Sequence, residues 1–312
     1  MRLFGFGLLT GLLVVLGGLL ACYAALSAFA PANVPAPAIT RLDLLDEKLR
    51  FLRRRPDFDP TILAVGSSVT WRQLSGAEFH SLAPGPRHFL NGATGYLHIH
   101  QTRDLANFYL DHYRGVKTLL VMVSLPDFQG CADEPAEMLD HESAALYAFR
   151  GWPPLYFYLR YFSPVRYIRL GTTLSRRQVP FAGDFYLDEY GSGPVWLPAG
   201  TKLGLRYGEI KTDAACIEAL RGFVRDTQTR GIRLVLVFTP IHPEYRTLYP
   251  ASIEWLTNLA ESISRDEGAN PRRLIVLDYV RDPLFKSEDF FDALHLQWPA
   301  VKRLSARIAG AM

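Results

Sequence analysis

The chain has 312 residues, of which 49% are hydrophobic, and its formal net charge is +3. This composition is sufficient for a large apolar core, and the near balance of charge argues against the strong basic field of a nucleic-acid-binding protein. The sequence lacks both the phosphate-binding P-loop pattern and the dinucleotide-binding Gly-x-Gly-x-x-Gly pattern, so we expect no cofactor.

The N-terminal segment, residues 1–30, is apolar enough to interact with a membrane. Residues 3–30 carry no charge, and about 20 apolar residues suffice to span a bilayer as a helix. We interpret the segment as a transmembrane signal anchor with Arg2 as its positive flank. A lipoprotein signal is the alternative, because residues 19–22 (Leu-Leu-Ala-Cys) approximate a lipidation box. Both interpretations place the rest of the chain outside the cytoplasm and make the lipid bilayer a partner.

A spacer and one domain follow this segment. Residues 31–40 are rich in proline, which favours an extended chain, and residues 41–312 are expected to form one α/β domain. Leucines at helical spacing predict an amphipathic helix over 42–52. Four arginines near the end of this helix, within residues 50–55, fit either a solvated helix end or contact with anionic lipid headgroups.

The domain alternates apolar runs with helical patterns. Continuous apolar strands separated by helices favour a parallel sheet that is covered on both faces. The predicted strands are 61–66, 88–91, 116–124, 232–238 and 273–278, and the predicted helices between and after them are 98–113, 213–229, 251–266 and 298–311.

A long insertion at 129–212 separates the third and fourth strands, and it is rich in aromatic residues and arginine. Three interpretations remain open: a cap whose rings stack on sugars, a layer that packs on the sheet, and a helix at a membrane interface. Cys131, inside the insertion, and Cys216, just after it, either form a disulfide in an oxidising compartment or remain free thiols. The pair His98 and His100 has no nearby carboxylate or cysteine set, and no metal is expected.

Two short blocks carry the candidate chemistry. The first strand leads into Gly66-Ser67-Ser68, and Asp292-Ala293-Leu294-His295 precedes the last helix. A serine hydroxyl becomes a good nucleophile when a histidine removes its proton and a carboxylate orients that histidine. Ser68, His295 and Asp292 would take these roles. In the simpler interpretation, the two serines only cap a helix.

Both blocks resemble those of the SGNH (GDSL-type) serine esterases and acyltransferases. The Gly-Ser-Ser variant is most similar to envelope members such as the alginate O-acetyltransferases and the D-alanyl-lipoteichoic acid transfer proteins. The resemblance covers roughly residues 60–310 apart from the insertion. It implies a three-layer α/β/α, flavodoxin-like domain with a mostly parallel five-stranded sheet, here preceded by one transmembrane helix.

The resemblance also implies an oxyanion hole. Its donors would be the N–H of Ser68 and the N–H of Gly92, which opens the block Gly-Ala-Thr-Gly. Gly92 also fits an ordinary turn. The family's third donor, an asparagine, is missing, and Ser-Leu-Pro-Asp ending at Asp127 stands in its place. Asp127, Trp71 and His242 are candidate substrate contacts, although a loop support, a core residue and a plain loop histidine are the respective alternatives.

These observations lead to one expected function and two alternatives. The expected function is a serine esterase or O-acyltransferase that acts on acyl esters, foremost acetyl esters, of an envelope or exported polysaccharide. Its domain would face the periplasm from a single-pass anchor in a bacterial inner membrane, with a membrane acyl donor as a further partner. The alternatives are a catalytically impaired glycan-binding scaffold and a lipid or thioester hydrolase.

Overall fold

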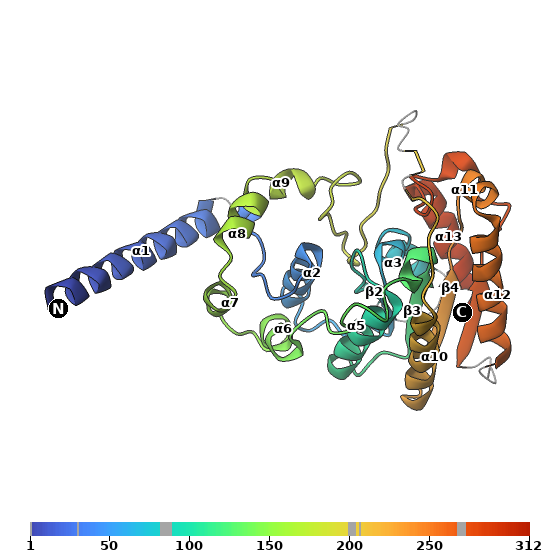
Figure 1. Ribbon diagram of the computed structural model, residues 1–312, viewed down its shortest axis with the longest axis horizontal. Helices are drawn as coiled ribbons and strands as arrows, with labels where there is room; N and C mark the ends of the chain where they lie inside the picture. Colours follow the sequence, from blue (N-terminus) through green and yellow to red (C-terminus); the bar gives the residue numbers. More distant parts are fainter. Residues whose placement is uncertain (1, 30, 82–88, 199–203, 206, 267–272) are drawn as a thin grey trace.

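A parallel sheet of five strands forms the centre of the molecule (Figure 1). The computed structural model describes the chain apart from residues 1, 30, 82–88, 199–203, 206 and 267–272. The strands are β1 (Ile62–Ala64), β2 (Phe89–Asn91), β3 (Thr118–Val123), β4 (Arg233–Phe238) and β5 (Leu274–Asp278), in the order β2-β1-β3-β4-β5. The predicted parallel α/β sheet is therefore confirmed.

Burial of both faces explains why the strands are continuously apolar. Every residue of β1, β2 and β3 is buried, as are five of the six residues of β4. In the register, Leu63 of β1 pairs with Leu90 of β2 on one side and with Leu119 of β3 on the other. Such central strands have no solvent-facing side chain that would produce alternation in the sequence.

Helices cover the sheet in two layers. Because parallel crossovers are right-handed, the three connections that run from β2 through β3 and β4 to β5 place their helices on one face. These helices are α5 (Ile99–His112), α10 (Ala214–Thr229) and α12 (Pro250–Asp266). The other face carries α4 (Gly76–Ser81) and α13 (Trp298–Ala311), which pack against each other. The arrangement is a three-layer α/β/α fold.

The N-terminal segment forms the helix α1 (Arg2–Phe29), which extends away from the sheet (Figure 1). It is followed by the short helix η1 (Pro31–Asn33). The ring of Tyr23 lies 5.0 Å from that of Tyr158. Among the described residues, no helix is long and apolar enough to cross a membrane, so the predicted transmembrane helix is not supported.

The described residues of the insertion include four short helices, the first of which packs against α2 (Asp43–Arg53). They are α6 (His141–Ala148), α7 (Pro154–Arg160), α8 (Pro164–Gly171) and α9 (Leu174–Arg177). Arg53 of α2 donates hydrogen bonds to the carbonyl oxygens of Tyr147 (2.6 Å) and Gly151 (3.3 Å). Arg53, at the end of α2, thus supports the insertion. Neither a solvated helix end nor contact with lipid headgroups, the two interpretations from sequence, included this role.

Lys48 of α2 joins the insertion to the sheet. Its side chain is fully buried, and its Nζ donates to the carbonyl oxygen of Asn91 at the end of β2 (2.8 Å) and to that of Gly191. Burial lowers the pKa of Lys48 to about 7, although the nearby Asp188 carboxylate raises it. A neutral amine still has two N–H donors, which matches the two carbonyl acceptors.

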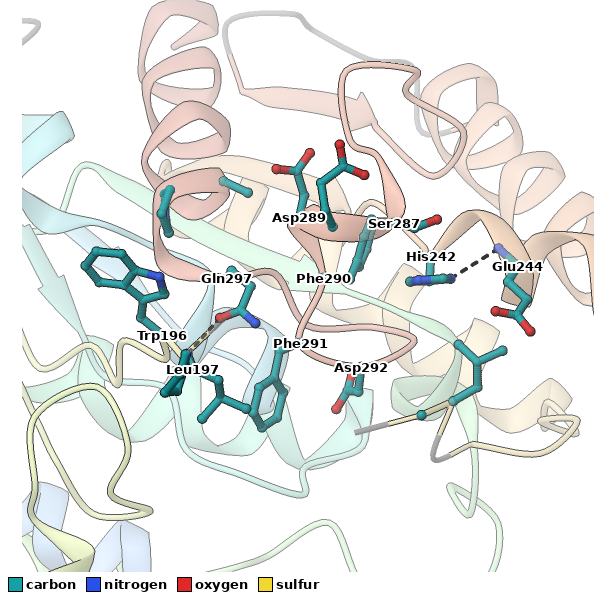
Figure 2. A pocket seen from close by; sticks show the side chains of 16 residues that line it. Trp196, Leu197, His242, Glu244, Ser287, Asp289, Phe290, Phe291, Asp292 and Gln297 are labelled. Carbon is teal, nitrogen blue, oxygen red and sulfur yellow. Dashed lines mark hydrogen bonds between the residues drawn. The ribbon is translucent and has the colours of Figure 1, made fainter. Parts of the chain in front are cut away.

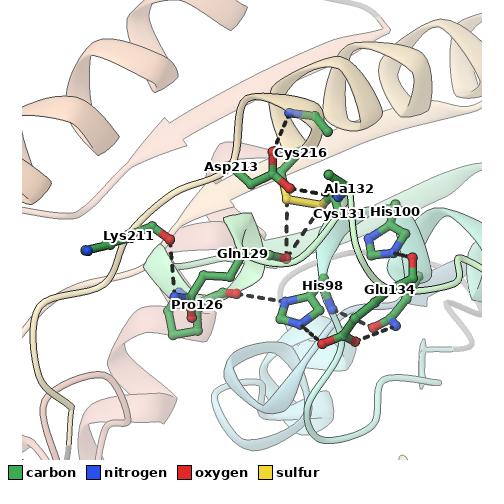
Figure 3. Close-up of a disulfide and its surroundings, with 12 residues drawn as sticks. His98, His100, Pro126, Gln129, Cys131, Ala132, Glu134, Lys211, Asp213 and Cys216 are labelled. Atoms are coloured by element: carbon green, nitrogen blue, oxygen red, sulfur yellow. Dashed lines mark hydrogen bonds and ion pairs between the residues drawn. A yellow bond between two sulfur atoms is a disulfide. The ribbon is translucent and has the colours of Figure 1, made fainter.

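A disulfide connects the first part of the insertion to α10 (Figure 3). Cys131 and Cys216 are bonded, with their Cα atoms 5.2 Å apart, which resolves the alternatives left open by the sequence. Nearby, the carboxylate of Glu134 lies 3.4 Å from Nε2 of His98, and its carbonyl oxygen lies 3.1 Å from Nε2 of His100. These histidines therefore hold the segment that contains Cys131 against the start of α5.

Candidate active site

A tight turn between β1 and the helix α3 (Ser68–Arg72) presents Ser68. A Cβ atom on Gly66 would lie 2.1 Å from Oγ1 of Thr70, so only glycine fits this turn without displacement. Thr70 in turn donates to the carbonyl oxygen of Met122 in β3 (3.0 Å). Ser68 is the first residue of α3, where backbone N–H groups have no partner within the helix. The turn thus fixes the hydroxyl and directs a free N–H at the carboxyl edge of the sheet.

Ser68, His295 and Asp292 form a hydrogen-bonded array. Oγ of Ser68 lies 2.9 Å from Nε2 of His295, and Nδ1 of His295 lies 3.0 Å from both carboxylate oxygens of Asp292. His295 and Asp292 are buried. The structure therefore brings together the three side chains that were selected from sequence, although Ser68 and His295 are 227 positions apart.

The carboxylate of Asp292 also organises its own loop. Its Oδ1 accepts hydrogen bonds from the backbone N–H of Leu294 (2.8 Å) and of His295 (2.9 Å). Burial is the largest influence on the pKa of Asp292 and raises it, but the charge of His295 and these hydrogen bonds together bring the pKa below its usual value. An ionised Asp292 favours a proton on Nδ1 of His295, which leaves Nε2 free to accept the proton of Ser68.

The loop between β5 and α13 is joined to the end of α3 by one hydrogen bond and is closed on itself by another. Nε2 of Gln73 donates to the carbonyl oxygen of Leu294 (2.9 Å), and the backbone N–H of Phe291 donates to that of His295 (2.7 Å). Gln73 directly follows α3 and Leu294 directly precedes His295. The first of these hydrogen bonds therefore links the segment that contains Ser68 to the loop that contains His295. This linkage holds the array across two separate segments of the chain.

The prediction that Gly92 donates to an oxyanion is wrong for this structure. The backbone N–H of Gly92 donates to the carbonyl oxygen of Ala64 (2.8 Å) and continues the pairing of β2 with β1. Glycine is needed here for a different reason, since a Cβ atom would lie 2.6 Å from the ring of Tyr109. The N–H groups that open α3, beginning with that of Ser68, stay the candidates for binding an oxyanion.

Trp71, close to Ser68 in α3, packs into the hydrophobic core. Its side chain is buried in a small cluster with residues of the insertion, including Leu170 and Phe185, so the core interpretation applies. The backbone N–H of Gly193 donates to the Trp71 carbonyl oxygen (3.0 Å), and a Cβ at Gly193 would collide with the indole. Trp71 therefore anchors the insertion next to the nucleophile.

Asp127 supports the loop after β3, where it belongs to the short helix η2 (Leu125–Phe128). Its carboxylate is buried and accepts a hydrogen bond from the backbone N–H of Ser124 (2.6 Å). Burial raises the pKa of Asp127 to about 7, and a hydrogen bond from the Ser67 side chain acts in the opposite direction. Because Ser67 precedes Ser68, Asp127 supports the turn that presents Ser68, as the loop-support alternative predicted.

A cavity of about 750 Å³ lies beside Asp292 (Figure 2). Its walls come from the end of the insertion, from the loop before α13, and from His242, which precedes α11 (Pro243–Leu248). The backbone N–H of Glu244 donates to Nδ1 of His242 (3.1 Å). Burial lowers the pKa of His242, which favours its neutral form. His242 thus lines the cavity beside Asp292, and its contact with substrate stays a prediction.

Several cavity residues were not selected from sequence. They include Trp196 and Gln297, and the carboxamide oxygen of Gln297 accepts from the backbone N–H of Leu197 (3.0 Å). Phe290 and Phe291 stand directly before Asp292, and their position next to the block was the available signal. Within the described ranges, no group of three or more His, Cys, Asp or Glu side chains is arranged to hold a metal ion.

Comparison of the chain with protein-family models and with curated proteins finds no match.

Proposed function

We propose that this protein is an SGNH-type serine ester hydrolase or O-acyltransferase that works through an acyl-serine intermediate. The observation that carries the proposal is the continuous array from Ser68 through His295 to Asp292, with contacts of 2.9 and 3.0 Å. A buried carboxylate, a histidine and a hydroxyl at the start of a helix in this order are the parts that nucleophilic acyl transfer requires.

The reaction would proceed in two transfers. Oγ of Ser68 attacks the ester carbonyl carbon while its proton moves to Nε2 of His295, and N–H groups at the start of α3 stabilise the oxyanion. The bond to the leaving oxygen then breaks, and His295 protonates that oxygen. A second hydroxyl, from water or a sugar, loses its proton to His295 and attacks the acyl-serine. The acyl group leaves with this oxygen, and the proton returns to Ser68.

The proposed substrate class is an acyl ester of an extracytoplasmic polysaccharide, with acetyl as the expected acyl group. The resemblance to envelope acyltransferases supports the class. The Cys131–Cys216 disulfide supports an oxidising compartment such as the periplasm. The apolar side chains exposed along α1 support attachment to a membrane through the N-terminal segment. A membrane acyl donor is the proposed second partner.

Labelling with a fluorophosphonate probe tests the nucleophile. The full chain should be labelled, Ser68→Ala should lose the label, and the control Ser264→Ala, at an exposed position of α12, should keep it. A label that persists in Ser68→Ala would reject Ser68 as the nucleophile. Release of acetate from an acetylated glycan, measured with and without a glycan acceptor, then separates the two activities: turnover to water alone would reject the transferase.

One observation favours a second candidate, a catalytically impaired glycan-binding protein. The N–H of Gly92 is already engaged by Ala64, so fewer oxyanion donors are available than the family pattern supplies. This candidate predicts glycan binding with neither labelling nor ester turnover by the unaltered chain.

A further inference from the structure

Arg72 lies next to the proposed nucleophile. It ends the five-residue helix α3 that Ser68 begins, and side chains four positions apart share a helix face. Long side chains in helices also lean toward the N-terminal turn, which here is the turn of Ser68. The guanidinium of Arg72 has Asp292 and Tyr96 among its electrostatic neighbours. The charge of Arg72 is therefore close enough to interact with that of Asp292.

The guanidinium of Arg72 forms a long ion pair and, with the described residues, no hydrogen bond. Its side chain is only 14% exposed, and its nearest carboxylate, that of Asp184, lies 3.8 Å away, beyond hydrogen-bonding distance. Among the described residues, none accepts a hydrogen bond from this guanidinium, which has five N–H donors. Instead, it lies over the ring of Trp71, 4.2 Å from the centroid. A largely buried cation without a hydrogen-bonded acceptor is costly, which points to a role in binding.

Arg177, at the end of α9, repeats this arrangement. Its guanidinium lies 3.9 Å from the ring centroid of Phe185, and its buried Nε has no hydrogen-bond partner among the described residues. That Nε lies 3.4 Å from the other carboxylate oxygen of Asp184. Two cations thus share one carboxylate, which is 62% exposed and able to move aside. The aromatic rings fix both guanidinium groups without using their N–H donors.

The surroundings favour an anionic ligand at this cluster over one in the cavity. The cavity beside Asp292 is lined by Glu244, Glu288 and Asp289, which would repel an anion. Tyr96, near Arg72, is 89% exposed. Its backbone φ is 61°, a conformation that costs free energy for residues other than glycine. Its ring is available to stack on a sugar.

We propose that Arg72 and Arg177 form a binding site for an anionic group, a carboxylate or a phosphate, carried by the sugar whose ester Ser68 attacks. Guanidinium groups bind both anions through two parallel hydrogen bonds. Asp184 is the internal competitor that the ligand displaces. The proposal rests on the proposed function, because it assigns the substrate of the same site: an acylated acidic sugar.

Matched acetyl esters test the site through kinetics. Three substrates, an acetylated methyl hexoside, the corresponding methyl hexuronoside and the hexoside 6-phosphate, differ only in the anion. Loss of charge-assisted hydrogen bonds should raise KM of Arg72→Gln for an anionic ester about ten- to a hundredfold. KM for the neutral ester should change less than about threefold. Arg177→Gln should act in the same direction, and Asp184→Asn should lower KM for the anionic esters.

The same experiment identifies the anion and includes a matched control. An effect confined to the hexuronoside assigns a carboxylate ligand, and one confined to the phosphate ester assigns a phosphate. Arg230→Gln removes an arginine paired with Asp111 away from the site and should change none of these constants. Equal effects of Arg72→Gln on neutral and anionic esters, or no effect on either, would overturn the anion site.

A binding measurement separates this inference from the proposed function. Calorimetry on Ser68→Ala with methyl hexuronoside, methyl hexoside and inorganic phosphate needs no turnover. Anion binding that disappears in Ser68→Ala/Arg72→Gln supports the site even where the unaltered chain is neither labelled nor active, a result that would reject only the esterase. If Ser68→Ala does not prefer either anionic probe to the neutral hexoside, the anion site is rejected even for an active enzyme.

Discussion

Asp292 combines two roles in one side chain. Its Oδ1 accepts from two backbone N–H groups and from Nδ1 of His295, while Oδ2 also contacts Nδ1. The same carboxylate therefore shapes the loop and selects the tautomer of the base. A spacing of three residues is therefore sufficient, because the turn that Asp292 forms with the backbone of His295 also brings the imidazole of His295 to the Asp292 carboxylate.

Replacing Asp292 with asparagine separates these roles. Asp292→Asn keeps an oxygen for the backbone N–H groups, so the melting temperature should change little. The amide stabilises the wrong tautomer of His295, and kcat for an acetyl ester should fall by about 10⁴. The measurement is kcat together with thermal unfolding. A decrease of less than tenfold in a folded variant would show that His295 does not depend on Asp292.

The sequence revealed this array but not its immediate surroundings. Ser68, Asp292 and His295 were found because their residue types and spacing determine a chemistry. Gly92 was assigned wrongly because the sequence does not show which carbonyl oxygen engages a given N–H, here that of Ala64. Arg72 was not singled out, since its significance depends on acceptors that a folded chain either supplies or does not.

At the scale of elements, periodicity predicted the sheet and its long helices. Apolar runs located all five strands, and the helices α5, α10, α12 and α13 lie within two residues of the predicted ranges. The helices α6 to α9 of the insertion were not predicted, because they contain only four to eight residues. Such short helices depend on tertiary contacts, for example those of Arg53 with the Tyr147 and Gly151 carbonyl oxygens, which no local pattern encodes.

The connection between α2 and the insertion should be visible in the pH dependence of stability. Lys48 has a pKa of about 7 in the fold against 10.5 as the reference for the unfolded chain. Between these values the unfolded chain binds more protons, so the contribution of Lys48 makes the free energy of unfolding rise with pH. Each pKa unit corresponds to about 1.4 kcal/mol.

Lys48→Met should remove this contribution. The free energy of unfolding of the variant minus that of the unaltered chain should therefore be about 2 kcal/mol larger at pH 7 than at pH 9. Urea unfolding of both proteins at the two pH values measures the difference, in which all other titrations cancel. An unchanged difference between pH 7 and pH 9 would mean that Lys48 is charged in the fold.

The whole molecule has an uneven distribution of apolar surface. Leu12, Val14 and Val15 of α1 are exposed, as are Val165 and Ile168 of α8. Between these helices lies an apolar groove of about 560 Å³. Contiguous exposed apolar surface is typical of a site of interaction. The groove is lined by residues of α7 and α8 as well as α1, so the insertion forms part of this apolar region. The helix α3, which begins at Ser68, lies beside the sheet and away from α1 (Figure 1).

Attachment to lipid through this side can be tested by flotation. The full chain should float with phospholipid vesicles in a density gradient, and a variant that lacks residues 1–29 should remain at the bottom while keeping its fluorophosphonate label. The label shows that the domain is still folded. Equal flotation of both proteins would assign membrane contact to the rest of the chain, and flotation of neither would reject attachment.

The 227 positions between Ser68 and His295 also have a consequence in time. During synthesis, Ser68 is made long before His295, so most of the chain must be synthesised before the contact between the two side chains can form. In the reaction proposed above, acyl transfer would therefore be postponed until the loop before α13 is in place.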